Sequence, residues 1–438
     1  MNTDASTISV IIPTHNRSAS LRRTLDALSA QTYPLQQVEV LVAADGCVDG
    51  TVEMLRRYRA PFGMRIVEQQ HEGPAAARNQ GAAHATGRLL LFLDDDVKAV
   101  PSLLEAHMRA HQRCPGQVVI GYLSPVLESQ AGFFRIQLRV WWEAMFDAIR
   151  QPGHRCGYRD LLSGNFSLAA ELFTRTGGFD PTLRCHEDYE LGMRLIKAGA
   201  SFIFAADALG YHFEITDLDR SLRRKYQEGQ ADVLLGSRHP ELRRMLPLAR
   251  FRVPHSSLSR ILYILAFEWP WGGDLLAVHL RHSLDLLERA RLRGRWRRLL
   301  DDLLGYWYWR GVAVELGSRR ALAGFIEGGP SLVDAGGGEL EIDLRKGLEA
   351  AERQLDEARP SGVHIRYGRQ SVGRIPPQSG VEGLRGVHLR PILATDLAMP
   401  LLKALALEGS TEAAIAAGCV LVAEPAPSLE ALHADRHP

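Results

Sequence analysis

The sequence predicts an α/β fold built on a mostly parallel sheet, and two patterns carry that prediction. Short apolar strands alternate with amphipathic helices up to about Pro125. The run from Leu89 to Leu93 is apolar throughout, which is typical of a strand buried on both faces. Beyond Pro125 the alternation breaks, and a helical region and a small α/β segment are expected to follow.

The expected elements of the first part are short. They are strands at 9–12, 38–42, 64–68 and 89–93 and helices at 16–31, 49–58 and 74–85. Leu21, Leu25 and Leu28 recur at helical spacing, Asp49 is a candidate N-cap, and Pro74 is suited to a first helical position. Ligands of such sheets bind at the carboxyl ends of the strands. We therefore expect a site where these strands end.

The later part reads as four further helical stretches and a small mixed segment. Helices are expected at 133–149, 191–198, 220–235 and across most of 254–325; strands at 339–344 and 363–367 flank a helix at 346–358. The tail after Pro425 reads as disordered. We expect four regions: residues 1–125 and 126–240, a helical extension at 241–328, and a C-terminal segment of unknown role at 329–438.

Composition excludes several classes of protein. The net charge is +1, which argues against nucleic-acid binding driven by overall charge. Five scattered cysteines without a CxxC motif suit a reducing compartment. No signal peptide is visible, and no apolar run reaches the ~18–20 residues that span a bilayer. The sequence predicts a cytoplasmic protein.

Three consecutive acids, Asp94, Asp95 and Asp96, follow the buried strand. Unpaired carboxylates in a core are very costly, so they need a partner of opposite charge. Mg²⁺ or Mn²⁺ is a natural partner, because these ions take oxygen ligands from carboxylates and phosphates. The alternative is a solvated loop that caps a following helix.

Together the motifs resemble those of the family 2 glycosyltransferases with the GT-A fold, in order and spacing over roughly residues 8–235. The matching stretches are VIIPTHNR at 10–17, VAADGCVDGT at 42–51, GPAAARNQG at 73–81, FLDDD at 92–96, GGFD at 177–180 and ED at 187–188. The resemblance implies a nucleotide-sugar donor, a divalent metal, and transfer with inversion at the anomeric carbon. It also implies that residues 1–125 are the donor-binding half of the GT-A domain and residues 126–240 the acceptor-binding half.

The resemblance also implies roles on the donor side. The donor-binding residues expected on this basis are Pro13, Thr14, Asn16, Asp45, Arg78, Asp94 and Asp95. Asp45 matches the aspartate that binds the nucleotide base, and a carboxylate that accepts from a ring N–H suits uracil; the alternative is a turn aspartate before a glycine. Ala44 and Cys47 depart from the family pattern, which leaves the base open.

The metal site implied by the resemblance centres on Asp96 as a direct ligand. Asp94 and Asp95 would serve the ribose, the sugar or metal-bound water. His212 is the second candidate metal ligand. The alternative, given equal weight, is that His212 is only hydrogen-bonded near the core. Arg78 either reaches the diphosphate or forms a structural ion pair with the acids.

Asp188 is the candidate catalytic base, with Glu187 beside it. Inverting transfer needs one carboxylate to take the proton of the acceptor hydroxyl. The alternative is an acid in a first helical turn that stabilises the helix N-terminus.

Seven arginines between Arg281 and Arg298, close to Trp269, Trp271 and Trp296, resemble a surface for anionic lipid headgroups. The alternative is a solvated basic helix that packs on the catalytic domain.

We therefore expect an inverting glycosyltransferase that uses a nucleotide sugar, a UDP-sugar first, and a glycan, lipid-linked or other hydroxyl acceptor, as in the synthesis of cell-envelope polysaccharide or glycolipid. Two alternatives stay open: a metal-dependent nucleotidyltransferase and a non-catalytic protein that binds sugar nucleotides. A dehydrogenase is not favoured, because no GxGxxG follows the first strand.

Overall fold

The computed structural model describes residues 8–114, 116–126, 132–213, 216–250, 256–330 and 339–408. The chain forms two compact units. The larger unit holds the described residues within 1–150, 156–335 and 379–382, and the smaller holds those within 151–155, 336–378 and 383–438. The four-part division expected from the sequence stays a prediction, and the tail after Pro425 lies outside the described residues.

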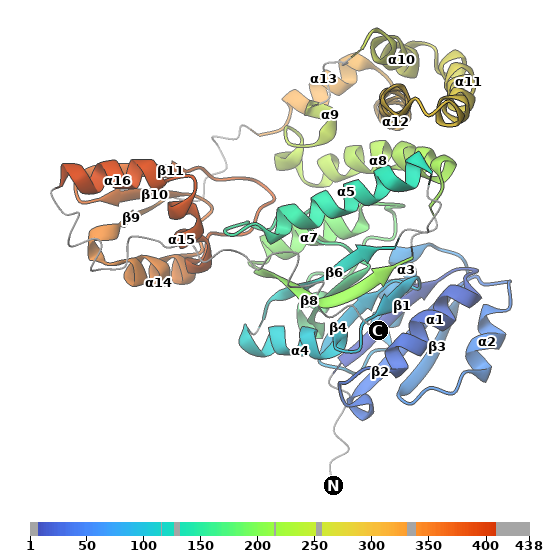
Figure 1. The fold of residues 1–438 in the computed structure, drawn as a ribbon, viewed down its shortest axis with the longest axis horizontal. Helices are drawn as coiled ribbons and strands as arrows, with labels where there is room; N and C mark the ends of the chain where they lie inside the picture. The colour runs from blue at the N-terminus through green and yellow to red at the C-terminus, as the bar shows by residue number, and fades with distance from the viewer. Residues whose placement is uncertain are drawn as a thin grey trace. The chain divides into compact units, whose positions relative to one another are not determined.

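The larger unit is built on an eight-stranded sheet with the order β3-β2-β1-β4-β7-β6-β8-β5 (Figure 1). Its first half is parallel: β1 pairs with β2 and β4, and β2 pairs with β3. These strands are β1 (Ile8–Thr14), β2 (Val38–Asp45), β3 (Gly63–Gln69) and β4 (Leu89–Leu93). All four coincide with the expected strands to within a few residues.

The second half of the sheet is mixed. Of the seven neighbouring strand pairs, four are parallel and three are antiparallel. The strands are β5 (Val97–Ala99), β6 (Val118–Pro125), β7 (Asn165–Ala169) and β8 (Phe202–His212). The α/β fold class is confirmed, with a helical region after it.

The sequence pattern missed β7 because two of its buried side chains are polar. Asn165 and Ser167 are both buried. The Asn165 side-chain oxygen accepts a hydrogen bond from His107 Nε2 at 2.9 Å, and the Ser167 hydroxyl is hydrogen-bonded to His107 Nδ1 at 2.8 Å. Burial lowers the pKa of His107 to about 4, so its imidazole is neutral and can be satisfied by these two groups.

Helices cover both faces of the sheet, which accounts for the unbroken apolar runs. Ile8, Val10 and Ile12 of β1 belong to one core, whereas Ile11 belongs to the core on the other face. The helices are α1 (Ser18–Ser29), α2 (Thr51–Arg57), α3 (Pro74–Ala83), α4 (Leu103–Arg113), α5 (Phe133–Arg150), α6 (Ala170–Arg175) and α7 (Glu187–Lys197), with a short 3-10 turn η1 (Leu35–Gln37) before β2.

Two helices begin later than expected, for conformational reasons. Asn16 has a left-handed φ of 53°, so α1 begins at Ser18. Gly50 has a φ of 84° and takes the N-cap position of α2, while Asp49 still accepts a hydrogen bond from the Thr51 amide at 3.1 Å.

Beyond the sheet the larger unit is helical, and Figure 1 shows α10 to α13 gathered beside α8. These helices and the short elements between them share one apolar core, which contains the buried residues Trp296, Tyr306 and Trp309. They are α8 (Leu218–Arg238), η2 (Pro240–Leu242), α9 (Pro247–Arg250), α10 (Ser257–Glu268), α11 (Pro270–Arg289), α12 (Arg293–Leu316) and α13 (Arg319–Glu327).

The smaller unit has its own three-stranded sheet in the order β11-β10-β9 and its own apolar core. It contains β9 (Leu340–Asp343), η3 (Leu344–Lys346), α14 (Leu348–Ala358), β10 (Val363–Tyr367), β11 (Gln370–Ile375), α15 (Gly386–Ala394) and α16 (Ala398–Leu407). Four neighbouring residues, 379–382, belong instead to the larger unit, where buried Glu382 accepts from the Phe202 amide at 3.0 Å.

Among the helices that the structure describes, none combines the length and apolar character needed to cross a bilayer.

The crossing of α8 and α12 requires glycine on both helices. A Cβ on Gly311 would collide with the carbonyl oxygen of Tyr226, and one on Gly229 would collide with that of Tyr308. We therefore expect Gly311→Ala to destabilise the larger unit by about 1–3 kcal/mol, as overpacking does, and to lower its melting temperature. Gly305→Ala on the same helix is the matched control, because nothing lies within 4 Å of its added methyl group. Equal melting temperatures for the two variants would contradict this account.

Candidate active site

Three chain segments meet where the parallel strands end. Thr14 lies opposite Ala44 in the register of β1 and β2, and Ile11 lies opposite Phe92 in that of β1 and β4. The residues after these ends, from His15, from Asp45 and from Asp94, therefore share one edge of the sheet, as expected from the sequence.

Asp95 is the structural member of the acid triplet. It is 5% exposed, accepts from the Thr14 hydroxyl at 2.7 Å, and pairs with the Arg17 guanidinium at 3.0 Å. Burial raises the pKa of Asp95 to about 6, although Arg17 and Thr14 act in the opposite direction. Its backbone carbonyl also accepts from the Thr24 hydroxyl, which ties the triplet to α1.

Asp94, Asp96 and His212 form a second group, with one potential ligand atom each and all three atoms within 4.8 Å of one another. His212 Nε2 lies 3.2 Å from Asp96 Oδ1. β8 brings His212 to the acids, because its end pairs with Val97 of β5. The structure thus joins Asp94 to Asp96, whereas the sequence expectation grouped Asp94 with Asp95.

This second group has the chemistry of a divalent-cation site. Asp96 Oδ1 is buried and accepts no hydrogen bond of good geometry from the described residues. Burial opposes ionisation of Asp96, yet His212 and Arg17 hold its pKa below the usual value, so the carboxylate is available as a ligand. Arg17 pairs with Asp96 Oδ2 at 2.8 Å and is 32% exposed, so its side chain has room to move away.

Arg78 connects the acid triplet to the second half of the site. Its guanidinium donates to Asp94 at 2.8 Å and to Glu187 at 2.9 Å, and its side chain is 5% exposed. It also lies 5.5 Å from the ring centre of Phe179. The structural ion pair considered from the sequence is therefore present, while contact of Arg78 with a diphosphate stays a prediction.

Asn79, the next residue of α3, is hydrogen-bonded through its side chain to the backbone of Phe179. Its amide group donates to the Phe179 carbonyl at 2.7 Å and accepts from the Phe179 amide at 2.8 Å. The third and fifth sequence motifs thus contact each other directly.

Asp188 is the carboxylate of α7 that is not held by a cation. It accepts a hydrogen bond from the Ser163 amide at 3.3 Å, whereas neighbouring Glu187 is committed to Arg78. Burial, and then the charge of Glu187, raise the pKa of Asp188 to about 6. A carboxylate with this pKa is ionised at neutral pH and is a stronger base than an ordinary aspartate.

The loop before Asp188 is held by a buried polar chain. His186 has a left-handed φ of 60° at the N-cap of α7. Its Nδ1 lies 3.1 Å from Asp232 of α8, which accepts from the Tyr308 hydroxyl of α12 at 2.7 Å. The helical extension therefore positions the start of α7.

Asp45 is saturated with hydrogen bonds. It accepts from the Glu72 amide, the Gln69 side chain and the Gly73 amide at 2.8–2.9 Å, and His71 lies 2.8 Å away. Burial favours the neutral acid, but these donors lower the pKa of Asp45 below its usual value. A carboxylate has about four acceptor positions. His71, 61% exposed, is the partner that a nucleotide base could replace.

The other expected donor residues shape the β1 end. Asn16 accepts from the Val48 amide at 2.7 Å, which joins the two loops, and Thr14 contacts Asp95 as described. Pro13 lies in register with Ala43 and makes part of the strand. Arg17 was missed as a site residue; its place just after β1, facing the acids of β4, was the available signal.

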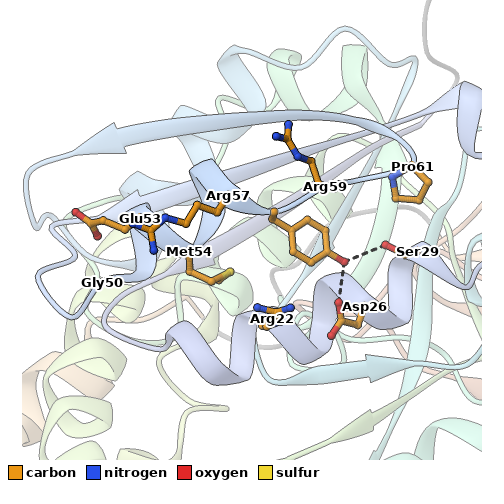
Figure 2. Close-up of a pocket in the computed structure, with 10 residues that line it drawn as sticks. Arg22, Asp26, Ser29, Gly50, Glu53, Met54, Arg57, Arg59 and Pro61 are labelled. Carbon is orange, nitrogen blue, oxygen red and sulfur yellow. Dashed lines mark hydrogen bonds between the residues drawn. The ribbon is translucent and has the colours of Figure 1, made fainter.

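A hollow of about 860 Å³ lies between α1 and α2 (Figure 2). Arginines border it, and the Tyr58 hydroxyl donates to Asp26 at 2.9 Å. None of its ten lining residues is among the expected site residues. We assign it no role in the chemistry.

Comparison with known proteins finds a family model that matches the first part of the chain. The family model described as "Glycosyl transferase family 2" matches residues 9–173, which contain β1 to β4 and the acid triplet.

Two curated relatives illustrate the similarity. The validoxylamine A glucosyltransferase of Streptomyces hygroscopicus subsp. jinggangensis is 34% identical over 232 residues, which cover 46% of this chain and 54% of that protein. The glycosyltransferase AglE of Haloferax volcanii is 26% identical over 241 residues, covering 52% of this chain and 73% of that protein. The chain spans about half the length of the first relatives that it matches.

Among solved structures, a mannosyltransferase from Pyrobaculum calidifontis in complex with GDP-Man and Mn²⁺ aligns with a TM-score of 0.44 and 18% identity, covering 68% of this chain and 85% of that chain. Staphylococcus aureus TarS, residues 1–349, aligns with a TM-score of 0.41 and 17% identity, covering 71% and 92%. Residues 9–173 of this chain are thus similar to glycosyl transferase family 2.

Proposed function

We propose that this protein is an inverting glycosyltransferase that moves a sugar from a nucleotide diphosphate sugar to an acceptor hydroxyl. The observation that carries the proposal is the Arg78 bridge. It joins Asp94 of the candidate cation site to Glu187, next to Asp188, so that leaving-group stabilisation and a general base share one site. The relative named as a glucosyltransferase supports transfer of a hexosyl group.

The reaction follows from these positions. The acceptor oxygen attacks the anomeric carbon as its proton passes to a carboxylate oxygen of Asp188. The new bond from carbon to the acceptor oxygen forms while the bond to the diphosphate oxygen breaks, and that electron pair leaves with the nucleoside diphosphate. Attack opposite to the leaving group inverts the anomeric configuration.

Asp94, Asp96 and His212 would hold a divalent cation, Mg²⁺ or Mn²⁺, which supplies neutralisation of the charge on the leaving diphosphate. Mg²⁺ prefers a shell of oxygen ligands, so an imidazole in the set favours Mn²⁺. On this account Asp95 holds Thr14 and Arg17 in place, and the Arg17 side chain would leave Asp96 free to hold the cation.

A UDP-sugar is the first donor to test. Asp45 can accept the imino N–H of uracil if the exposed His71 side chain gives up its position, while the Gln69 side chain and the Glu72 and Gly73 amides keep theirs. Pro13, Thr14 and Asn16 would line the same subsite. The acceptor is a glycan, a lipid-linked glycan or another hydroxyl compound.

The alternatives are less well supported. A nucleotidyltransferase would need a Gly-rich basic loop after the first strand, where this chain has Pro13-Thr14-His15-Asn16-Arg17. A protein that only binds sugar nucleotides has no need of an aspartate with the raised pKa of Asp188. A reducing, cytoplasmic setting remains part of the proposal.

The cation site can be tested by substitution. Asp96→Ala should abolish the Mn²⁺-dependent stabilisation by UDP and reduce transfer to background, because the central ligand is lost. A thermal-shift screen of nucleoside diphosphates with and without Mn²⁺ measures the first effect. Asp207→Ala, which alters an exposed aspartate paired with Arg109, is the control and should behave as wild type. Full activity of Asp96→Ala in the presence of a chelator would refute the assignment.

The base can be separated from donor binding. Asp188→Asn should lower kcat by about 10²–10⁴, the usual contribution of a general base, while calorimetry finds the donor Kd nearly unchanged. A collapse of donor affinity with normal turnover at saturation would make Asp188 a binding residue instead.

The pH profile should report the same group. Asp188 acts only as the carboxylate, so kcat should rise with pH through an apparent pKa of about 6 and level off above it. The residual rate of Asp188→Asn should lack this rising limb. An identical limb in both proteins would assign it to another group.

A further inference from the structure

We infer that α11 and the start of α12 form a docking surface for an anionic membrane. Two neighbouring sets of residues make it up. The apolar stripe consists of Trp269, Trp271, Leu275, Val278 and Leu286, and the arginine cluster consists of Arg289, Arg291, Arg293, Arg295, Arg297 and Arg298.

The apolar stripe is exposed along one helix, with His282 between Val278 and Leu286. Trp271 is 65% exposed, Leu275 52% and Leu286 63%. From Trp271 to Leu286 the stripe residues of α11 recur at multiples of three to four residues, which places them on one face. The opposite face carries Ala277 and Leu284, which are buried in the helical core. The packing of α11 against the helical core therefore uses the opposite face and leaves the apolar stripe exposed.

The tryptophans give the stripe the character of a membrane interface. Trp269 and Trp271 contact each other edge to face, with ring centres 4.9 Å apart, at the start of α11. Amphipathic aromatic rings are enriched at headgroup depth. The expectation that Trp296 joins them is wrong: it is 2% exposed and packs against Phe133 in the core.

The arginine cluster indicates that the partner surface is negatively charged. All six side chains are exposed, and none pairs with an acid of the described residues. The nearby acids are engaged elsewhere: Asp285 pairs with Arg281, and Glu288 accepts from the Phe133 amide. Arg289 continues the face of Leu286 one turn further along α11. In a chain of net charge +1, this local excess complements a negative surface.

Apolar side chains beside uncompensated arginines match a bilayer that contains anionic lipid, since the rings and aliphatic chains enter the interface while the guanidinium groups meet headgroups. The inference goes beyond the proposed transfer reaction and does not depend on it. Asp188→Asn should bind vesicles as the wild type does.

Co-sedimentation of the full chain with vesicles tests the inference. We expect binding to phosphatidylcholine vesicles that contain phosphatidylglycerol at low salt, release at high salt, and little binding to pure phosphatidylcholine. Replacing Arg291, Arg293 and Arg295 by glutamate should weaken binding by at least ~10²-fold, from about fivefold per arginine near the surface.

The matched charge control replaces Arg22, Arg57 and Arg59 by glutamate. These arginines are exposed at the hollow between α1 and α2 (Figure 2), and the change in net charge is the same. This control should keep nearly all vesicle binding. If the two charge variants lose binding equally, the attraction belongs to the overall charge and the docking surface is refuted.

The apolar stripe needs its own pair of variants. Trp271→Ser with Leu275→Ser should weaken binding to anionic vesicles several-fold, whereas Met399→Ser with Leu402→Ser, at exposed positions of α16, should not. Wild-type protein that binds neither vesicle type, or both equally, overturns the inference. So does a stripe variant that keeps vesicle binding but dissociates a dimer in sedimentation equilibrium, because the face would then be a contact between copies of the chain.

Discussion

The buried guanidinium of Arg78 is the interaction on which the candidate site depends. It lies between Asp94 at the end of β4 and Glu187 at the start of α7, two elements that are distant in the chain. A buried charge is tolerated only when it is paired, and removal of both carboxylates would leave the Arg78 charge uncompensated. The pairing therefore links the end of β4 to the start of α7. Asn79, through its two hydrogen bonds to Phe179, adds a second link at the same position.

Neighbouring carboxylates in this site differ in role because their surroundings differ. In the triplet, Asp95 is held by Thr14 and Arg17, whereas Asp96 faces His212 with a buried oxygen that lacks a good donor. On α7, Glu187 neutralises Arg78 and so leaves Asp188 as the acid with a raised pKa. One member of each group stabilises the structure and another is left for chemistry.

The helical extension contributes to the same site from a distance. Tyr308 of α12 donates to Asp232 of α8, which contacts His186 at the N-cap of α7. The close crossing of α8 and α12 at Gly229 and Gly311 sets the positions of Tyr308 and Asp232 relative to each other. If α11 rests on a membrane, the surface that holds the protein there and the loop that carries the base belong to one packed group of helices. An acceptor embedded in or attached to a bilayer would suit this arrangement.

The sequence by itself determined the parallel strands and the order of the site loops, because apolar runs and the polar residues at their ends are local patterns. The roles of Thr14, Asp45, Asp96 and His212 come from the resemblance to family 2 glycosyltransferases and stay predictions. The tertiary structure decided how the acids divide their roles, that Arg17 pairs with two of them, that β7 runs antiparallel with buried polar side chains, and that Trp296 is core while Trp271 is exposed. Each of these outcomes depends on which side chains distant in the sequence become neighbours, and burial, pairing and pKa are properties of that neighbourhood rather than of the residue type.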